Sequence, residues 1–231
     1  MGVLATVLLA CGPGGGAGGA GGGDASGGGV GGGGGTTADA GPVRGDDPFA
    51  DAVVSFTPGP GAGFGQDRLP GVVLGPPDGA GDGMGSLDVL SLGQGGVIVL
   101  AFTDVLAVDG PGPDLTVFEN PFGRFAETAA VAVSDDGTSW HEFPCASLDR
   151  DGGYPGCAGV QPVLATADSG TATDPLRSGG DLFDLAQLGV TRARFVRITD
   201  TGHNPTGSPT AGFDLDAVAV VHGQRLDGGA F

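Results

Sequence analysis

The sequence has no lysine, so its nine basic residues are all arginine, and it carries only one tryptophan and one tyrosine. Against these nine cations stand 27 Asp and Glu residues, which give the 231-residue chain a formal net charge of −18. Nucleic-acid binding needs a basic surface that contacts phosphates, and charge-driven docking on anionic lipid needs basic clusters. The composition therefore argues against both classes of partner, and we expect no nucleic-acid ligand.

A long hydrophobic run is also lacking. The apolar run at residues 2–10 is shorter than the about 20 residues that span a bilayer, but it suits the hydrophobic part of a secretory signal. Leu8-Leu9-Ala10-Cys11 resembles a lipobox, whose cysteine is acylated and becomes the new N-terminus. We expect residues 1–10 to be a lipoprotein signal and Cys11 to hold an exported protein on a membrane of the bacterial envelope. No basic residue precedes the run, so the alternative is a cysteine that follows an apolar start by chance.

Glycine is abundant but unevenly spread. The chain has 51 glycines, and residues 12–35 are almost all glycine. Such a stretch cannot bury apolar surface and behaves as a flexible coil. We expect residues 11–47 to be a flexible tether, whose glycine-rich part reaches about 25–30 Å.

Short apolar runs separated by turn residues begin near Pro48. In the turns, proline presets φ, glycine accepts positive φ and aspartate caps its own backbone. This spacing predicts an all-β fold: an antiparallel jelly-roll-type β-sandwich that forms one domain at residues 48–223, followed by a tail at 224–231. The predicted strands are 52–56, 97–102, 115–119, 129–134, 195–199 and 214–221, with one short helix at 182–188.

Cys145 and Cys157 remain as a pair if Cys11 is acylated. We expect them to form a disulfide, because an exported protein folds in an oxidising compartment. Two thiols without a neighbouring histidine do not fill a zinc site. Between them lies Tyr154, the candidate for an exposed ligand contact, because loops on a rigid scaffold often carry binding residues.

Two segments resemble discoidin-like (galactose-binding-like) jelly-roll domains. They are VAVSDDGTSW at residues 131–140 and ARFVRI at residues 193–198. Together with Phe118-Glu119-Asn120-Pro121, GDLFDL at 180–185 and GFDLDAV at 212–218, they resemble a group of bacterial proteins labelled "cell surface protein" over most of residues 48–223. The resemblance implies a non-catalytic surface domain that attaches to glycans or matrix. With one Trp and one Tyr, the chain departs from the discoidins that bind lipid or sugar through exposed aromatic loops.

Acidic residues supply the candidate metal site. Asp214 and Asp216 share a face of the predicted last strand, which Val218 and Val220 continue, while Leu215 and Ala217 line the other face. We expect both faces of this strand to be buried, and buried carboxylates need a cation or arginine partners that balance their charge. Jelly-roll sugar-binding modules often hold structural Ca²⁺ with carboxylates near their last strand, and this placement resembles theirs. The predicted Ca²⁺ ligands are Asp109, Asp114, Glu119, Asp214 and Asp216.

An alternative for the acidic residues needs no metal. Asp109 and Asp114 then only cap turns, while Asp214 and Asp216 pair with Arg194 or Arg197. The sequence is compatible with both interpretations.

Catalytic patterns are missing. His141, His203 and His222 have no metalloprotease spacing, and no nucleophile elbow occurs. Glu119 with Glu127 or Asp114 has no spacing that establishes a glycosidase pair. Trp140 follows a turn and is interpreted as part of the core edge. We predict that the protein is not an enzyme.

Three functional hypotheses follow. The first is a lipid-anchored binding module on the bacterial envelope, which holds Ca²⁺ and binds a glycan or a cell-surface partner. The second is a purely structural envelope protein without a specific ligand. The third is a hydrolase, which the missing catalytic patterns disfavour.

Overall fold

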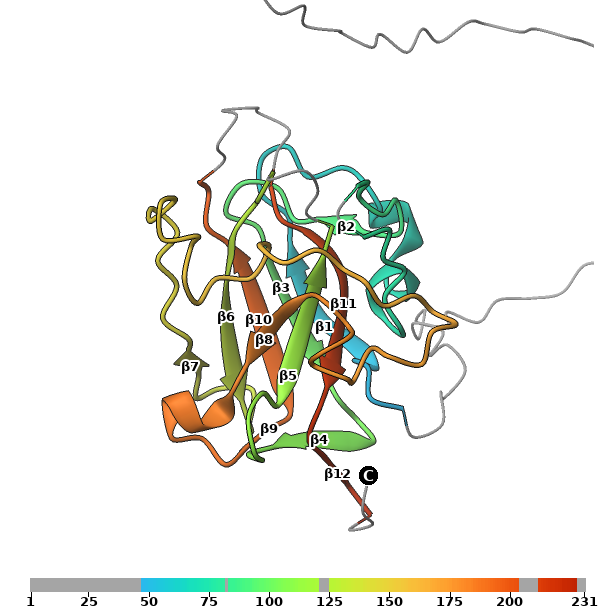
Figure 1. Ribbon diagram of the computed structural model, residues 1–231, viewed down its shortest axis with the longest axis vertical. Helices are drawn as coiled ribbons and strands as arrows, with labels where there is room; N and C mark the ends of the chain where they lie inside the picture. Colours follow the sequence, from blue (N-terminus) through green and yellow to red (C-terminus); the bar gives the residue numbers. More distant parts are fainter. Residues whose placement is uncertain (1–46, 82, 121–124, 204–211, 228–231) are drawn as a thin grey trace, which may run out of the picture. The chain divides into compact units, whose positions relative to one another are not determined.

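The computed structural model describes residues 47–81, 83–120, 125–203 and 212–227 (Figure 1). The chain divides after Gly41, and all of these residues belong to the second unit, Pro42–Phe231. The described elements are strands and three 3₁₀ helices: η1 (Gln66–Arg68), η2 (Gly71–Val73) and η3 (Leu185–Leu188). Within the described ranges, no helix is long and hydrophobic enough to cross a bilayer.

Three antiparallel sheets make up the fold. The first has the order β1 (Ala52–Thr57), β3 (Val97–Ala101), β10 (Phe195–Asp200), β6 (Ala129–Ser134) and β7 (His141–Glu142). The second has the order β2 (Leu90–Ser91), β11 (Asp214–Val220), β5 (Leu115–Glu119) and β8 (Asp181–Phe183). The third has the order β12 (Gly223–Arg225), β4 (Val105–Val108) and β9 (Arg192–Ala193). Neighbouring strands are mostly distant in sequence, so the chain crosses repeatedly between sheets, and the predicted jelly-roll-type β-sandwich is confirmed.

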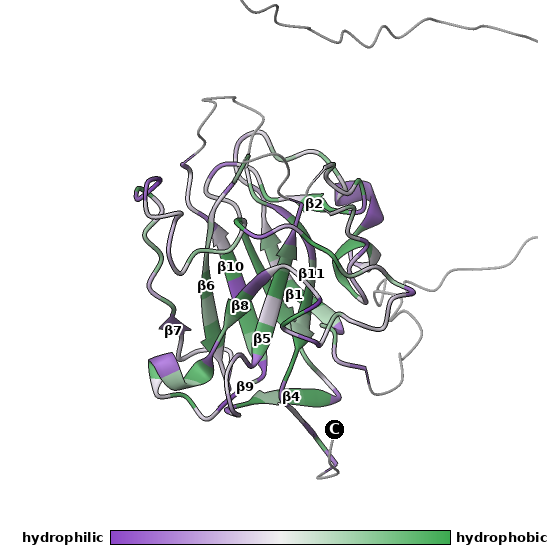
Figure 2. Cartoon of the chain, in the orientation of Figure 1, coloured by the Kyte–Doolittle hydropathy of each residue, from purple (hydrophilic) through white to green (hydrophobic). Residues whose placement is uncertain are grey.

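The main core lies between the two larger sheets. Alternate residues of β3, β10, β6 and β5 point into this core, as the pleat requires. Most of the strand residues in Figure 2 have the green of hydrophobic residues. From the first sheet the core receives Ile98, Leu100, Val131, Val133, Val196 and Ile198, and from the second Leu115, Val117, Leu215, Val218 and Val220. Because these side chains are fully buried, they supply the main hydrophobic stabilisation of the sandwich.

A smaller apolar cluster covers the outer face of the β11–β5 pair. Phe118, Ala217 and Ala219 of these strands pack against side chains of the segment that precedes β8, namely Val163, Ala165 and Ala172. Strand β11 is therefore buried on both faces, which explains its nearly continuous apolar sequence after Asp216.

The six predicted strands all occur within one residue of their expected ends. The predicted helix at 182–188 is wrong in its first half, where β8 pairs with β5. Only Leu185–Leu188 is helical, because Asp184 caps it by accepting the N–H of Ala186 at 2.9 Å. Strand β12 continues to Arg225, into the predicted tail, and pairs with β4.

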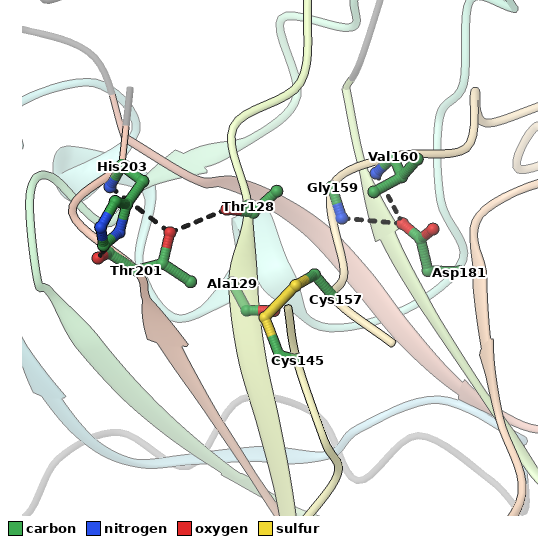
Figure 3. The surroundings of a disulfide bond; sticks show 9 residues. All are labelled: Thr128, Ala129, Cys145, Cys157, Gly159, Val160, Asp181, Thr201 and His203. Carbon is green, nitrogen blue, oxygen red and sulfur yellow. Dashed lines mark hydrogen bonds between the residues drawn. A yellow bond between two sulfur atoms is a disulfide. The ribbon is translucent and has the colours of Figure 1, made fainter. Parts of the chain in front are cut away.

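Cys145 and Cys157 form the predicted disulfide, with an S–S distance of 2.05 Å (Figure 3). The loop between them is held by its own backbone hydrogen bonds, including Ala146 N–H to the Pro155 carbonyl at 3.0 Å and Tyr154 N–H to the Asp149 carbonyl at 2.8 Å. At its base, Ala158 pairs with Ala129 of β6. The loop is thus a compact unit attached to the edge of the first sheet.

Replacing both cysteines with alanine should lower the free energy of unfolding by about 3 kcal/mol, because the disulfide restricts a short loop in the unfolded chain. Denaturant unfolding of the oxidised protein and of the Cys145→Ala/Cys157→Ala variant measures this difference. Reduced wild-type protein is the control and should match the variant. Equal stability of the oxidised protein and the variant would contradict the prediction.

Candidate functional site

The five predicted metal ligands lie in three separate places. Asp114 precedes β5 and Glu119 ends it, so about 16 Å of extended strand separates them at about 3.3 Å per residue. Asp109 lies near Asp114, Asp214 lies near Glu119, and Asp216 contacts neither group.

The first place, the Asp109 group, consists of Asp109, Asp114 and Asp184. One carboxylate oxygen of each residue lies within 4.8 Å of the other two. Ca²⁺ binds each oxygen ligand at about 2.4 Å, so two oxygens on opposite sides of the ion lie about twice that distance apart. The separation of the three carboxylate oxygens therefore allows them to hold one metal ion. Asp109 is exposed and Asp184 half-buried, which leaves room for water ligands. Asp184 is not among the predicted ligands, because residues 182–188 were predicted to form a helix.

Asp114 is the fixed member of the Asp109 group. It is fully buried, and its Oδ1 accepts the N–H of Gly110 at 2.8 Å and contacts Nδ1 of His222 at 3.0 Å. Its Oδ2 accepts the N–H of Leu185 at 2.8 Å. Asp114 therefore does cap a turn, as the metal-free alternative expected. One lone pair of Oδ2 stays available for a cation, because each carboxylate oxygen accepts about two bonds.

The second place, the Glu119 cluster, consists of Glu119, Glu127, Asp200 and Asp214. These residues surround the backbone that enters β11. The N–H of Gly212 donates to Glu127 Oε1 at 3.0 Å and that of Phe213 donates to Asp200 Oδ2 at 2.9 Å. The next N–H, of Asp214, hydrogen bonds to Glu119. Glu127 and Asp200 are not among the predicted ligands, because only the fold brings them next to Glu119 and Asp214.

Three carboxyl groups of the Glu119 cluster have raised pKa values. Burial, with repulsion from Asp214 and Glu127, raises the pKa of Glu119 well above its ordinary value. Burial and the charge of Asp214 raise the pKa of Glu127 to about 7, and burial raises that of Asp214 to about 6. Glu119 Oε2 and Asp214 Oδ1 are buried and have no hydrogen-bond partner in the described part of the chain.

The third place is Asp216, which lies at a β-bulge between Leu215 and Ala217. Its carboxylate accepts the N–H of Asp78 at 3.1 and 3.3 Å, so it fastens a distant loop to the sheet. Because of the bulge, Leu215 and Val218 both face the main core while Ala217 faces the outer cluster. The predicted strand faces are therefore wrong beyond Leu215, since regular alternation does not cross a bulge.

The arginine alternative for Asp214 and Asp216 is wrong. Arg194 Nε donates to the Phe102 carbonyl at 3.4 Å. Arg197 lies 3.7 Å from Glu142 and stacks over the ring of Trp140 at 4.7 Å. Trp140 is half-buried and lies outside both apolar clusters, so the core-edge interpretation of this residue is not confirmed.

Tyr154 is half-buried and has a left-handed backbone, with a φ of 54°. Surface hollows of about 510 and 520 Å³ lie beside Cys145 and Ala146, but Tyr154 does not line either of them. Its contact with a ligand stays a prediction. Near the same loop, Asp181 accepts the N–H groups of Gly159 and Val160 at 2.7 and 3.0 Å (Figure 3).

The histidines make local contacts. His203 Nδ1 lies 2.7 Å from the Thr201 carbonyl, and the Thr201 hydroxyl lies 2.7 Å from that of Thr128 (Figure 3). His222 contacts Asp114, and His141 is exposed. None of the three joins a group of metal-ligating side chains in the described ranges.

Comparison with profiles of known protein families finds no match, and no curated protein matches the chain.

Asp216 should make the metal-free protein less stable as pH rises. Burial raises its pKa from 3.8 to about 8, so between these values the native state keeps a proton that the unfolded state releases. The stabilisation is complete below about pH 4 and is lost toward about pH 8, at about 1.4 kcal/mol per pH unit for one proton. Denaturant unfolding in EDTA from about pH 5 to about pH 8 should show a shallower decline for Asp216→Asn.

The matched control for this prediction is Asp67→Asn, which removes one charge at an exposed position. It should keep the wild-type slope. Identical slopes for Asp216→Asn and the wild type would show that Asp216 is ionised in the native state and would contradict the prediction.

Proposed function

We propose that the protein is a non-catalytic, Ca²⁺-binding β-sandwich module that acylated Cys11 anchors to the bacterial envelope. The observation that carries the proposal is the Asp109 group, whose three carboxylate oxygens lie within 4.8 Å of one another. Asp114 is buried, Asp184 half-buried and Asp109 exposed, and a cation between the three carboxylates would remove their mutual repulsion.

The donor set favours Ca²⁺ over other metals. All three ligands are carboxylate oxygens, and no thiolate or ring nitrogen belongs to the group among the described residues. Hard oxygen ligands suit Ca²⁺ and Mg²⁺, and irregular geometry with six to eight ligands suits Ca²⁺ better. Hydrogen bonds hold Asp114 and, through Ala186, Asp184, while the exposed Asp109 can adjust to the ion.

A glycan or another surface component is the proposed partner. This part rests on the resemblance to discoidin-like domains and on the missing catalytic patterns. The surface hollows beside the disulfide loop are lined by Pro144, Cys145, Ala146, Ser147, Leu148, Asp149, Pro155, Gly156 and Gln187, which include a single carboxylate. A glycosidase needs two carboxyl groups facing one cleft, so these hollows do not favour a hydrolase.

Ca²⁺ should raise the melting temperature of EDTA-treated protein, since a ligand that binds only the native state stabilises it by RT ln(1 + [L]/Kd), about 2.7 kcal/mol at a hundredfold excess over Kd. In Asp109→Asn this increase should become clearly smaller. The Asp109 side chain makes no hydrogen bond within the described ranges, so its replacement leaves the fold intact. Thermal melts with and without Ca²⁺ measure the effect.

Asp67→Asn, with the same loss of charge at an exposed site, serves as the control and should respond to Ca²⁺ like the wild type. If Asp109→Asn also responds like the wild type, the Asp109 group binds no Ca²⁺. A glycan array probed in the presence of Ca²⁺ is a separate test of the partner. A binding module should bind at least one glycan on the array, whereas a purely structural protein should bind none.

Cys11 should carry the lipid. Cells that express the protein and are fed an alkyne-labelled fatty acid should incorporate label into the wild type and none into Cys11→Ser. The Cys145→Ala/Cys157→Ala variant is the control and should keep the label. Label that persists in Cys11→Ser would refute the lipid anchor at this position.

A further inference from the structure

The Glu119 cluster contains buried acceptor atoms that the protein itself does not satisfy. Glu119 is 2% exposed, yet its Oε2 has no hydrogen-bond partner among the described residues, and the same holds for Asp214 Oδ1. A buried, unsatisfied carboxylate oxygen costs more free energy than almost any other polar defect. Asp214 directly precedes Leu215, the residue that pairs with Glu119 across β5 and β11, so the two residues lie at the same end of this strand pair.

The backbone donors near the Glu119 cluster are already engaged. The N–H groups of Gly212, Phe213 and Asp214 interact with Glu127, Asp200 and Glu119, one with each. Asp200 Oδ1 takes two further N–H groups, those of Gly95 and Gly202, both at 2.7 Å. Among the residues that the structure describes, no N–H group donates to either of the two unpartnered oxygens.

The basic side chains of the described residues form no ion pair with the Glu119 cluster. In the described ranges, the ion pairs join Arg68 to Asp88, Arg192 to Asp135, Arg197 to Glu142, His222 to Asp114 and Arg225 to Asp227. None involves a member of the cluster. Four carboxylates therefore meet inside the protein without a countercharge among these residues.

We propose that the Glu119 cluster is a second Ca²⁺ site, in which the ion binds Glu119 Oε2 and Asp214 Oδ1 together. This site is independent of the Asp109 group, from which the length of β5 separates it. Its oxygens are less tightly gathered than those of the Asp109 group, because no three of its carboxylates lie within 4.8 Å of one another. The ion therefore takes two carboxylates as its primary ligands, and nearby oxygens complete the shell.

Ca²⁺ fits this site better than Mg²⁺. The available donors are all oxygens: the carboxylates, the hydroxyl of Ser91, which hydrogen bonds to Asp214, and neighbouring carbonyls. Mg²⁺ demands a nearly octahedral shell and retains its water, whereas Ca²⁺ accepts irregular shells of protein oxygens. A divalent ion can coordinate both unpartnered oxygens and supplies two positive charges, whereas a shared proton supplies one.

Calorimetric titration of chelator-treated protein with Ca²⁺ tests the second site. The wild type should bind two ions, Glu119→Gln one, Asp109→Asn one, and the double variant none. Glu142→Gln, the same substitution at an exposed position, is the control and should bind two. Asp214→Asn should reproduce Glu119→Gln, so the test does not depend on the folding of one variant.

Thermal melts add a readout that a merely structural glutamate would not give. In EDTA, Glu119→Gln should melt above the wild type, because native wild-type protein must either bury a charge or bind a proton at Glu119, and the amide requires neither. In Ca²⁺ it should lose the part of the temperature increase that this site supplies.

Two bound ions in Glu119→Gln and in Asp214→Asn would overturn the second site, as would Mg²⁺ binding there as tightly as Ca²⁺. Loss of one ion only in these variants, with Asp109→Asn unaffected, would refute the Asp109 group and support the second site.

Discussion

Buried carboxylates that accept backbone N–H groups hold the loops of this sandwich in place. Asp114 accepts the backbone N–H of Leu185, and Asp200 accepts that of Gly95. Asp216 accepts the backbone N–H of Asp78, which is 138 positions away in the sequence. The bond to Leu185 satisfies an amide that would otherwise lie buried without a partner. Each of these carboxyl groups also lies in the protein interior, where burial raises the pKa of Asp181 to about 7 and that of Asp216 to about 8. The fold of a chain with 27 acidic and nine basic residues thus depends on how these charges are compensated.

The longer strands could be predicted because their apolar patterns are local. Strands of two residues, such as Leu90–Ser91 and Arg192–Ala193, exist only through pairing with distant partners and leave no pattern in the sequence. The carboxylate sites were predicted only in part, because some of their residues are distant from the others in sequence. Asp214 and Glu119 were found as acidic residues at strand ends, but Glu127 and Asp200 join them only through the fold. The bulge at Asp216 separates it from Asp214, and nothing in the local sequence marks that bulge.

The two carboxylate groups lie where separate parts of the sandwich meet. Asp109 follows β4 of the third sheet, whereas Asp114 and Asp184 flank β5 and β8 of the second. Glu119 and Asp214 end β5 and begin β11, while Glu127 and Asp200 belong to the β6 and β10 side of the first sheet. A cation in either group would link elements from two sheets. In this lysine-free chain it would occupy the place that an arginine bridge takes in a more basic protein.

Metal binding at such junctions couples folding to the surroundings, because binding free energy that is absent in the unfolded chain adds to stability. Extracellular modules bind Ca²⁺ with dissociation constants of about 10⁻⁴ to 10⁻³ M, so their sites fill outside the cell and stay largely free at cytosolic Ca²⁺. On the proposed function, the carboxylates would repel one another before export and would bind their ions afterwards. Binding of these ions would explain why the protein buries so many carboxylates. A purely structural envelope protein could keep its carboxylates on the surface, where hydration stabilises them without any ion.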